Sequence, residues 1–189
     1  MNLNKLKNIG MDKNQLASFI STLVATLAGV LIAIWLTDSG IKIKEKEDTI
    51  KLLQTAKLIL TNTSKYSEQL SKRIIAYEKD SINYSQKIIE STKEENPIPY
   101  PDLFETIISN ELVSKNISEY SHPAIYSGLI NLRKLANHET IEHYLNSLEE
   151  MTVVLDLEIE LLKGEINTTD IKTLSKQDKN LRILELKRD

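Results

Sequence analysis

Leu16 to Leu36 reads LASFISTLVATLAGVLIAIWL, and these 21 consecutive residues carry no charge. At a rise of about 1.5 Å per residue, a helix of this length is roughly 30 Å long, which matches the hydrocarbon core of a lipid bilayer. Trp35 lies near one end, where an indole ring can place its N–H among the lipid headgroups. The stretch therefore predicts a transmembrane helix over residues 16–37, preceded by a short polar tail over residues 1–15.

A cleaved signal peptide is the alternative interpretation of this apolar stretch. Signal peptides have an apolar core of about 7–15 residues, followed by small residues at the cleavage site. Here the core is longer, and the bulky residues Ile34, Trp35 and Leu36 stand where small ones are needed. These features favour a span that is retained in the mature protein.

The predicted span has two chemically different faces when its residues are placed at intervals of about 100° around a helix. Large aliphatic side chains fill one face, whereas small or hydroxylated side chains gather on the other. Membrane helices associate through close packing and interhelical hydrogen bonds, and small and hydroxylated residues favour both. The small-residue face comprises Ser18, Ser21, Thr22, Ala25, Thr26, Gly29 and Ala33.

Two interpretations of the small-residue face remain open. In the first, it forms a tight contact between copies of the chain, because Ala25, Gly29 and Ala33 place a small residue at every fourth position. In the second, Ser18, Thr22, Ala25 and Gly29 line a narrow pore in a ring of copies. One helix cannot enclose a pore, so the second interpretation requires a homo-oligomer, for which a tetramer is one candidate.

The soluble part is predicted to be all-α. Only five glycines and four prolines occur in the 189 residues, and no stretch alternates in the manner of a strand. Residues 38–95 contain no proline and are predicted as a long juxtamembrane helix, formed by one helix or by two nearly continuous ones. Apolar or small residues recur there with the heptad spacing of a coiled coil, at Leu53, Ala56, Leu60, Thr63, Leu70, Ile74, Tyr77, Tyr84 and Ile88.

Residues 96–189 are predicted to form a helical domain that packs on the long helix. Alternating prolines at 97–101 predict an extended connection, after which Asp102 is expected to cap a helix together with Glu105. Further helices are predicted at about 102–109, at 110–117, from Ser121 onward, at 139–163 with a stop at Gly164, and from Thr168 or Thr169 to Leu186.

Composition and motifs exclude several functional classes. The net charge of −3 predicts neither a nucleic-acid nor a membrane-surface partner for the chain as a whole. The absence of cysteine excludes disulfides, thiolate zinc sites and cysteine nucleophiles. The motifs GxxxxGKS/T, GxGxxG and GxSxG are also absent. We therefore expect a protein that is not an enzyme, with no catalytic residue, no metal and no cofactor.

The histidines and carboxylates follow no catalytic or metal-binding pattern. His138 and His143 are five residues apart, which separates them by about 140° on a helix, so they do not form the i, i+4 pair that shares a metal ion. The acidic helix at 139–165 is predicted to offer a solvated face or a partner surface for basic helices. Its later carboxylates are Glu149, Glu150, Asp156, Glu158 and Glu160.

Lysines recur at multiples of seven residues in the predicted long helix. Residues seven apart stay on one side of a supercoiled helix, so copies around an axis could turn such a strip toward a shared cavity for a polyanion such as an oligonucleotide. The alternative is an ordinary solvated face whose lysines pair with Asp48, Glu68 and other neighbours. This lysine row comprises Lys44, Lys51, Lys65, Lys72 and Lys79, and the C-terminal helix adds Lys172, Lys176 and Lys179.

Three segments carry a resemblance to known proteins: FISTLVATLAGVLIAIWL ahead of a charged helix, then PYPDLFETIISNE and PAIYSGLINLRKL. They resemble bacterial single-span, membrane-anchored helical proteins, several of which are accessory or effector proteins in antiphage defence. The layout of the whole chain is similar to that of the membrane effector of the Hailong system. The resemblance implies a homo-oligomeric ion channel in the bacterial inner membrane, whose cytoplasmic domain is gated by a DNA oligomer that a nucleotidyltransferase makes.

A second functional hypothesis keeps the span only as an anchor in the lipid bilayer. The chain would then be a membrane-anchored scaffold or sensor that binds a protein partner and does not conduct ions. The flanking charges hardly orient the span, since lysines occur in nearly equal number on both sides of it. From the resemblance we expect the soluble domain on the cytoplasmic side.

Overall fold

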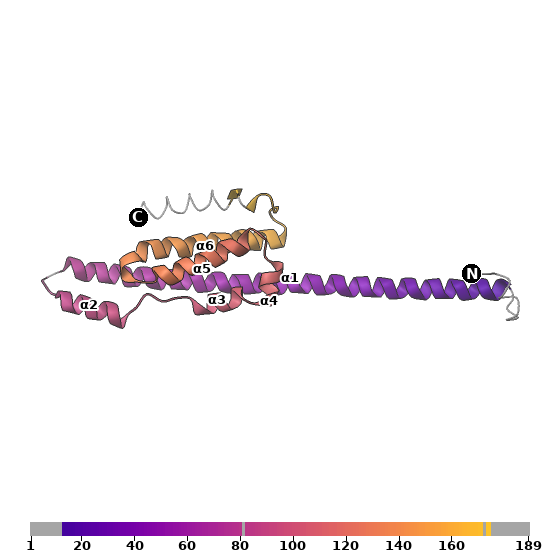
Figure 1. Cartoon of the computed structure of the whole chain (residues 1–189), viewed down its shortest axis with the longest axis horizontal. Helices are drawn as coiled ribbons and strands as arrows, with labels where there is room; N and C mark the ends of the chain where they lie inside the picture. Colours follow the sequence, from indigo (N-terminus) through magenta and orange to yellow (C-terminus); the bar gives the residue numbers. More distant parts are fainter. Residues whose placement is uncertain (1–12, 81, 172, 175–189) are drawn as a thin grey trace. The chain divides into compact units, whose positions relative to one another are not determined.

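All regular structure is helical in the ranges that the structure describes (Figure 1), which confirms the all-α prediction. This computed structural model describes residues 13–80, 82–171 and 173–174. The helices are α1 (Lys13–Lys79), α2 (Gln86–Glu95), α3 (Asp102–Ile108), α4 (Glu111–Asn116), α5 (Ser121–Leu135), the short 3-10 helix η2 (His138–Thr140) and α6 (Ile141–Lys163).

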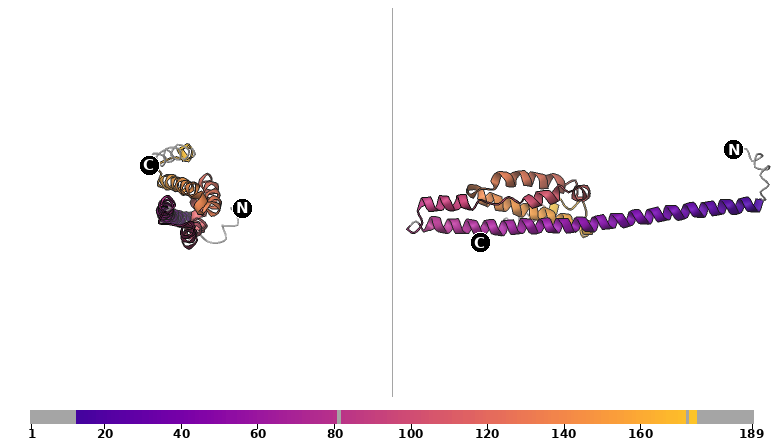
Figure 2. Two further views of the ribbon diagram at one scale, coloured as in Figure 1. Left: turned by 90° about the vertical axis from the view of Figure 1, so that its left-hand side faces the viewer. Right: turned by 90° about the horizontal axis from the view of Figure 1, so that it is seen from below.

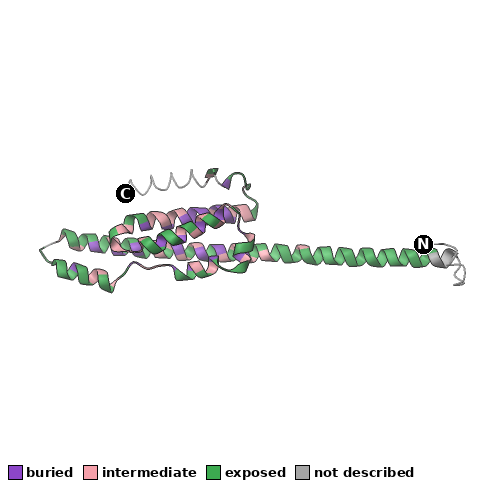
Figure 3. Ribbon diagram, viewed as in Figure 1, coloured by how far each residue is buried: buried purple, intermediate pink, exposed green. Residues whose placement is uncertain are grey.

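The chain divides into two compact units, residues 1–45 and residues 46–189, and α1 contributes to both. In the first unit, every side chain from Ala17 to Asp38 is exposed (Figure 3). The most apolar window of 18 residues has a mean hydropathy of 2.3, and none of it is buried. By length and composition, this one helix near the N-terminus is therefore able to cross a membrane.

In the second unit, α1 buries a single row of side chains. Successive members of the row are three, four or seven residues apart, which is the spacing that keeps one face of a helix against its neighbours. Most of them pack in one core with side chains from α3, α5 and α6, such as Phe104, Leu132 and Leu148. The buried row comprises Thr49, Leu53, Ala56, Leu60, Ser67, Leu70 and Ile74.

The predicted helix over residues 38–95 is not continuous, because a turn separates α1 from α2. The side chain of Asp80 accepts hydrogen bonds from the backbone N–H and the Nδ2 of Asn83, at 3.3 and 3.1 Å. Helix α2 then runs back beside the end of α1 (Figure 2), where Lys93 forms an ion pair of 2.9 Å with Glu78. Tyr84 consequently stacks on Tyr77, with ring centroids 4.1 Å apart, instead of continuing the heptad row two helical turns after it.

Helix α6 contributes side chains to two apolar clusters of the second unit. Its residues 151–155 are all buried, because one side faces the main core and the other faces a smaller cluster that contains Ile171. On α5, a Cβ added at Gly128 would lie 2.6 Å from the Sδ of Met151, so these two helices are in close contact. The predicted stop at Gly164 is confirmed, since its φ of +81° is left-handed and the Glu165 N–H donates to the Glu160 carbonyl at 2.9 Å.

The predicted cap at Asp102 is wrong. The N-cap of α3 is Pro101, no side chain caps this helix end, and Asp102 is already the first helical residue. The carboxylate of Glu105 turns instead toward Tyr100 and Arg133. The two helical segments predicted nearby, at 102–109 and 110–117, are present as α3 and α4.

Two hydrogen bonds hold the proline-containing connection between α2 and α3 against the helices. The Tyr144 hydroxyl donates to the Pro99 carbonyl, and the Nε2 of His138 lies 2.9 Å from the Asn96 carbonyl oxygen. Between these two points, the side chain of Ile98 is buried in the main core. The connection therefore packs as part of the core and does not act as a free linker.

Replacing Tyr144 by phenylalanine is expected to lower the free energy of unfolding by about 1 kcal/mol at neutral pH, because the buried hydroxyl no longer satisfies the Pro99 carbonyl. Burial raises the pKa of Tyr144 above its ordinary value of 10.0. Its stabilising contribution is therefore present below pH 10 and falls as the pH rises, since the unfolded state loses its proton first. Thermal unfolding by circular dichroism should show the gap between wild type and variant narrowing above pH 10.

The matched control for this prediction is Tyr66→Phe, because Tyr66 is 49% exposed. Its melting temperature should equal that of the wild type at neutral pH. An equal loss of stability in both variants would show that the bond to Pro99 contributes nothing specific.

Candidate functional site

The predicted small-residue face is exposed along α1 in the first unit. Ser18, Ser21, Thr22, Ala25, Gly29 and Ala33 are all solvent-accessible there. A Cβ added at Gly29 would meet no atom of the described residues within 4 Å, so the described part of a single copy does not require glycine at this position. A glycine at this position allows another helix to approach closely.

The threonine hydroxyls of this helix are satisfied by its own backbone. Thr22 donates to the Ser18 carbonyl at 2.9 Å, and Thr26 donates to the Thr22 carbonyl at 2.8 Å. Thr37 repeats the arrangement with the Ala33 carbonyl at 2.9 Å. These hydroxyls have a partner without water, as a segment in lipid requires.

In the second unit, the lysine row lies on the outer side of α1. Lys51, Lys65 and Lys72 each come two residues before a member of the buried row. In a heptad, this is the position that points directly away from the buried face. All five predicted lysines of α1 are exposed, with Lys44 in the first unit and the others in the second.

Intrahelical ion pairs occupy part of the lysine row. The Nζ of Lys51 lies 2.9 Å from the Oδ1 of Asp48, and this hydrogen bond raises the pKa of Lys51. The Nζ of Lys72 lies 2.6 Å from the Oε1 of Glu68. Within residues 13–80 and 82–171, Lys65 forms no ion pair. The lysine row thus combines solvated cations with locally neutralised ones. The three lysines that the predicted C-terminal helix adds, Lys172, Lys176 and Lys179, lie outside the residues whose side chains are described.

The prediction of a solvated acidic face on α6 is wrong for Glu158, which is fully buried. Its Oε1 accepts the Ser118 N–H at 2.8 Å, and its Oε2 accepts the Ser118 hydroxyl at 2.7 Å. Ser118 Oγ in turn accepts the N–H of Ser121, at 3.1 Å, where α5 begins. Asp156 is also engaged, in an ion pair of 2.5 Å with Lys57 of α1. These two carboxylates hold α6 to neighbouring parts of the unit.

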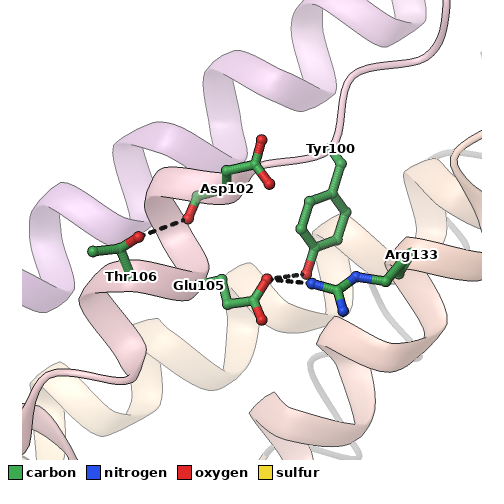
Figure 4. A network of polar contacts seen from close by, with 5 residues as sticks. All are labelled: Tyr100, Asp102, Glu105, Thr106 and Arg133. Carbon is green, nitrogen blue, oxygen red and sulfur yellow. Dashed lines mark hydrogen bonds and ion pairs between the residues drawn. The ribbon is translucent and has the colours of Figure 1, made fainter.

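A polar network that the sequence did not predict joins the proline-containing connection, α3 and α5 (Figure 4). The Tyr100 hydroxyl donates to Glu105 Oε2 at 2.9 Å, and Arg133 Nη2 lies 2.7 Å from the same oxygen. The Arg133 guanidinium also lies 5.1 Å from the centroid of the Tyr100 ring. The pKa of Tyr100 is raised mainly by partial burial and, to a smaller extent, by the hydrogen bond to Glu105. The negative charge of Glu105 raises the pKa of Arg133.

No cluster of three or more histidine, aspartate or glutamate side chains suited to a metal ion occurs in the part of the chain that the structure describes. His138 is engaged with the Asn96 carbonyl, whereas His143 is exposed. We therefore assign no metal ligand among these residues.

Comparison of the chain with protein-family models, with curated proteins and with solved structures finds no match. Its class is thus defined by its own structure: over the residues that the structure describes, the chain is all-helical, with one helix near the N-terminus that is long and apolar enough to cross a membrane. The resemblance to antiphage membrane effectors remains a prediction.

Proposed function

We propose that the chain assembles as a homo-oligomer in the bacterial inner membrane and forms an ion-conducting pore, whose opening depends on a ligand bound to the helical domain. The observation that carries this proposal is the continuity of α1. One helix from Lys13 to Lys79 contains both the exposed apolar segment and the buried row of the second unit. A change in packing around the buried row therefore has a direct covalent route to the span.

The exposure of the apolar segment supports assembly in lipid. Its large side chains are about half exposed or more, as at Leu31 with 66% and Trp35 with 67%, which is costly in water and favourable among lipid tails. Its threonine hydroxyls are already satisfied, so lipid contact leaves none of these donors unpaired. The small-residue face then offers the surface for contact between copies.

The mass of the detergent-extracted particle, measured by light scattering with the detergent contribution subtracted, tests the proposal first. We expect several copies per particle. Planar-bilayer recordings of the same preparation, with a short single-stranded DNA oligomer added as the proposed ligand, should show unitary conductance steps. A monomeric particle would end the pore proposal, because one helix cannot enclose a conducting path.

A scaffold or sensor without conductance is the second candidate function. It is favoured by the independence of the second unit, which contains its own core from Leu53 to Ile159. Replacing residues 16–37 by an unrelated apolar helix distinguishes the two functions. Activity in the cell should survive this exchange if the span is only an anchor, and should be lost if the span forms the pore.

The oligonucleotide ligand and the role in antiphage defence are proposed from the resemblance alone. If the lysine row binds DNA, changing Lys65, Lys72 and Lys79 together to glutamine should abolish binding of a short single-stranded DNA at physiological salt, and any binding left at low salt should depend less on salt. The slope of log K against log salt falls by about 0.7 for each phosphate that the protein no longer neutralises. Fluorescence anisotropy with a labelled oligomer at several salt concentrations measures both effects.

The control for this experiment changes the same number of exposed lysines elsewhere in the second unit, namely Lys87, Lys115 and Lys163. This variant has the same net charge as the first and should keep the wild-type slope. If both variants bind DNA equally, the lysine row is not the binding surface.

A further inference from the structure

Beside the Tyr100–Glu105–Arg133 network, the second unit has an open hollow of about 230 Å³. Its lining combines aromatic, aliphatic and cationic side chains, which is the composition of a site for a small organic molecule. The buried side chain of Leu129 is the most enclosed member of the lining, and Ile130 is 57% exposed. The complete lining is Tyr100, Glu105, Tyr126, Leu129, Ile130, Arg133 and Lys134.

Arg133 contacts two partners at this hollow, Glu105 and the Tyr100 ring. Glu105 engages one terminal nitrogen (Figure 4), and the guanidinium carbon lies 5.1 Å from the centroid of the Tyr100 ring. A guanidinium carries five N–H donors in a rigid fork, so one contact with Glu105 leaves donors for a second anion. Because the side chain is already positioned, less conformational entropy is lost when a ligand binds.

Two further polar groups of the lining have no protein partner within residues 13–80 and 82–171. The Lys134 ammonium forms no ion pair there, and the Tyr126 hydroxyl forms no hydrogen bond there. Arg133 and Lys134 carry two positive charges against the single negative charge of Glu105. The hollow is therefore electropositive, and it has both an aromatic wall and an apolar wall.

We propose that this hollow binds a small organic anion that joins one planar ring to one carboxylate or phosphate group. The anionic group binds the free N–H donors of Arg133 and the ammonium of Lys134. The ring packs against Leu129, Ile130 and the tyrosine rings. A volume of about 230 Å³ lies below the range of drug-sized ligands, which indicates a ligand with a single ring.

This site goes beyond the function proposed above and does not depend on it. All its residues lie in the second unit, and none belongs to the lysine row or to the small-residue face. Loss of ligand binding at the hollow would leave the particle mass and the conductance as they are, so the two proposals fail separately.

Fluorine NMR of the full chain in lipid nanodiscs tests the proposal, with 4-fluorophenyl phosphate and 4-fluorobenzoate as probes. We expect saturable line broadening with at least one probe, and the comparison of the two assigns phosphate or carboxylate as the preferred group. Inorganic phosphate should compete at least tenfold more weakly, because it lacks the ring.

Arg133→Gln should weaken binding about tenfold, since a hydrogen bond to a charged group is lost. Ile130→Glu is a second test at an exposed position, because it places a negative charge at the rim and should weaken binding as strongly. The matched control is Arg73→Gln: Arg73 also lies over a tyrosine ring, at 5.8 Å from the Tyr77 centroid, but does not line the hollow.

Thermal unfolding of each variant verifies that it is folded. Weaker binding in Arg133→Gln and Ile130→Glu, with unchanged binding in Arg73→Gln, would support the site. The proposal is overturned if neither probe binds saturably to the wild type, or if Arg133→Gln and Arg73→Gln bind as tightly as each other.

Discussion

Replacing Ser118 by alanine is expected to lower the free energy of unfolding by about 3 kcal/mol, far more than most serine substitutions. The hydroxyl of Ser118 donates to the buried carboxylate of Glu158, and a hydrogen bond to a charged group contributes about 1.5–3 kcal/mol. The same oxygen accepts the N–H of the buried Ser121, whose loss of a partner costs a further 1–3 kcal/mol or so. Denaturant unfolding followed by circular dichroism measures the change.

The same atoms are removed in the control Ser127→Ala, at an exposed position on α5. This variant should lie within about 0.5 kcal/mol of the wild type. Similar stability of both variants would mean that the Glu158 contact is not formed in solution.

A double-mutant cycle with Glu158→Gln separates the contact from general effects of the substitutions. Because Ser118 and Glu158 share hydrogen bonds, the two changes should not be additive, and the double variant should lose less stability than the sum of the single ones. Additive losses would indicate that the two residues act independently.

Glu158 also shows where sequence reasoning fails. It lies between Leu157 and Ile159, in a stretch whose other faces are also apolar, so its neighbours already indicated burial. The prediction instead followed the charge of the whole segment and assigned a solvated face. The partner, Ser118, lies 40 residues away along the chain, and no local pattern identifies such a contact.

The fold was predictable where one residue type decides the local conformation. Gly164 ends α6 in the left-handed region, and Pro123 lies in the first turn of α5, as each residue favours. The turn after Lys79 contains neither glycine nor proline. It is held by hydrogen bonds that Asn83 donates to the side-chain carboxylate of Asp80. The prediction, which followed periodicity alone, therefore extended the helix through this turn.

The candidate sites also differ in how far the sequence alone predicts them. The small-residue face and the lysine row depend on spacing along one helix, and the residues of both lie within α1. Their roles in packing, conduction or ligand binding stay predictions. The hollow beside Arg133 requires three segments to meet, namely the proline-containing connection, α3 and α5. Tyr100, Glu105 and Arg133 have no diagnostic spacing, and only the folded chain brings them together.

Gly29→Leu is expected to abolish the conductance of the proposed pore. Within the described part of one copy, a Cβ at this position meets open space, and leucine favours a helix more than glycine does. The substitution therefore leaves the single helix intact and acts only where copies approach one another or where ions pass. Planar-bilayer recordings and the mass of the detergent-extracted particle are measured on the same preparation.

The pair of measurements also separates the two interpretations of the small-residue face. If Gly29 lies in a contact between copies, leucine should lower the particle mass, because helices that approach through glycine cannot accommodate it. If Gly29 lines the pore, the mass should stay as in the wild type while conductance is lost. Val30→Leu, which adds bulk on the aliphatic face, should leave both quantities unchanged. Conductance of Gly29→Leu equal to that of the wild type would remove this face from the conducting path altogether.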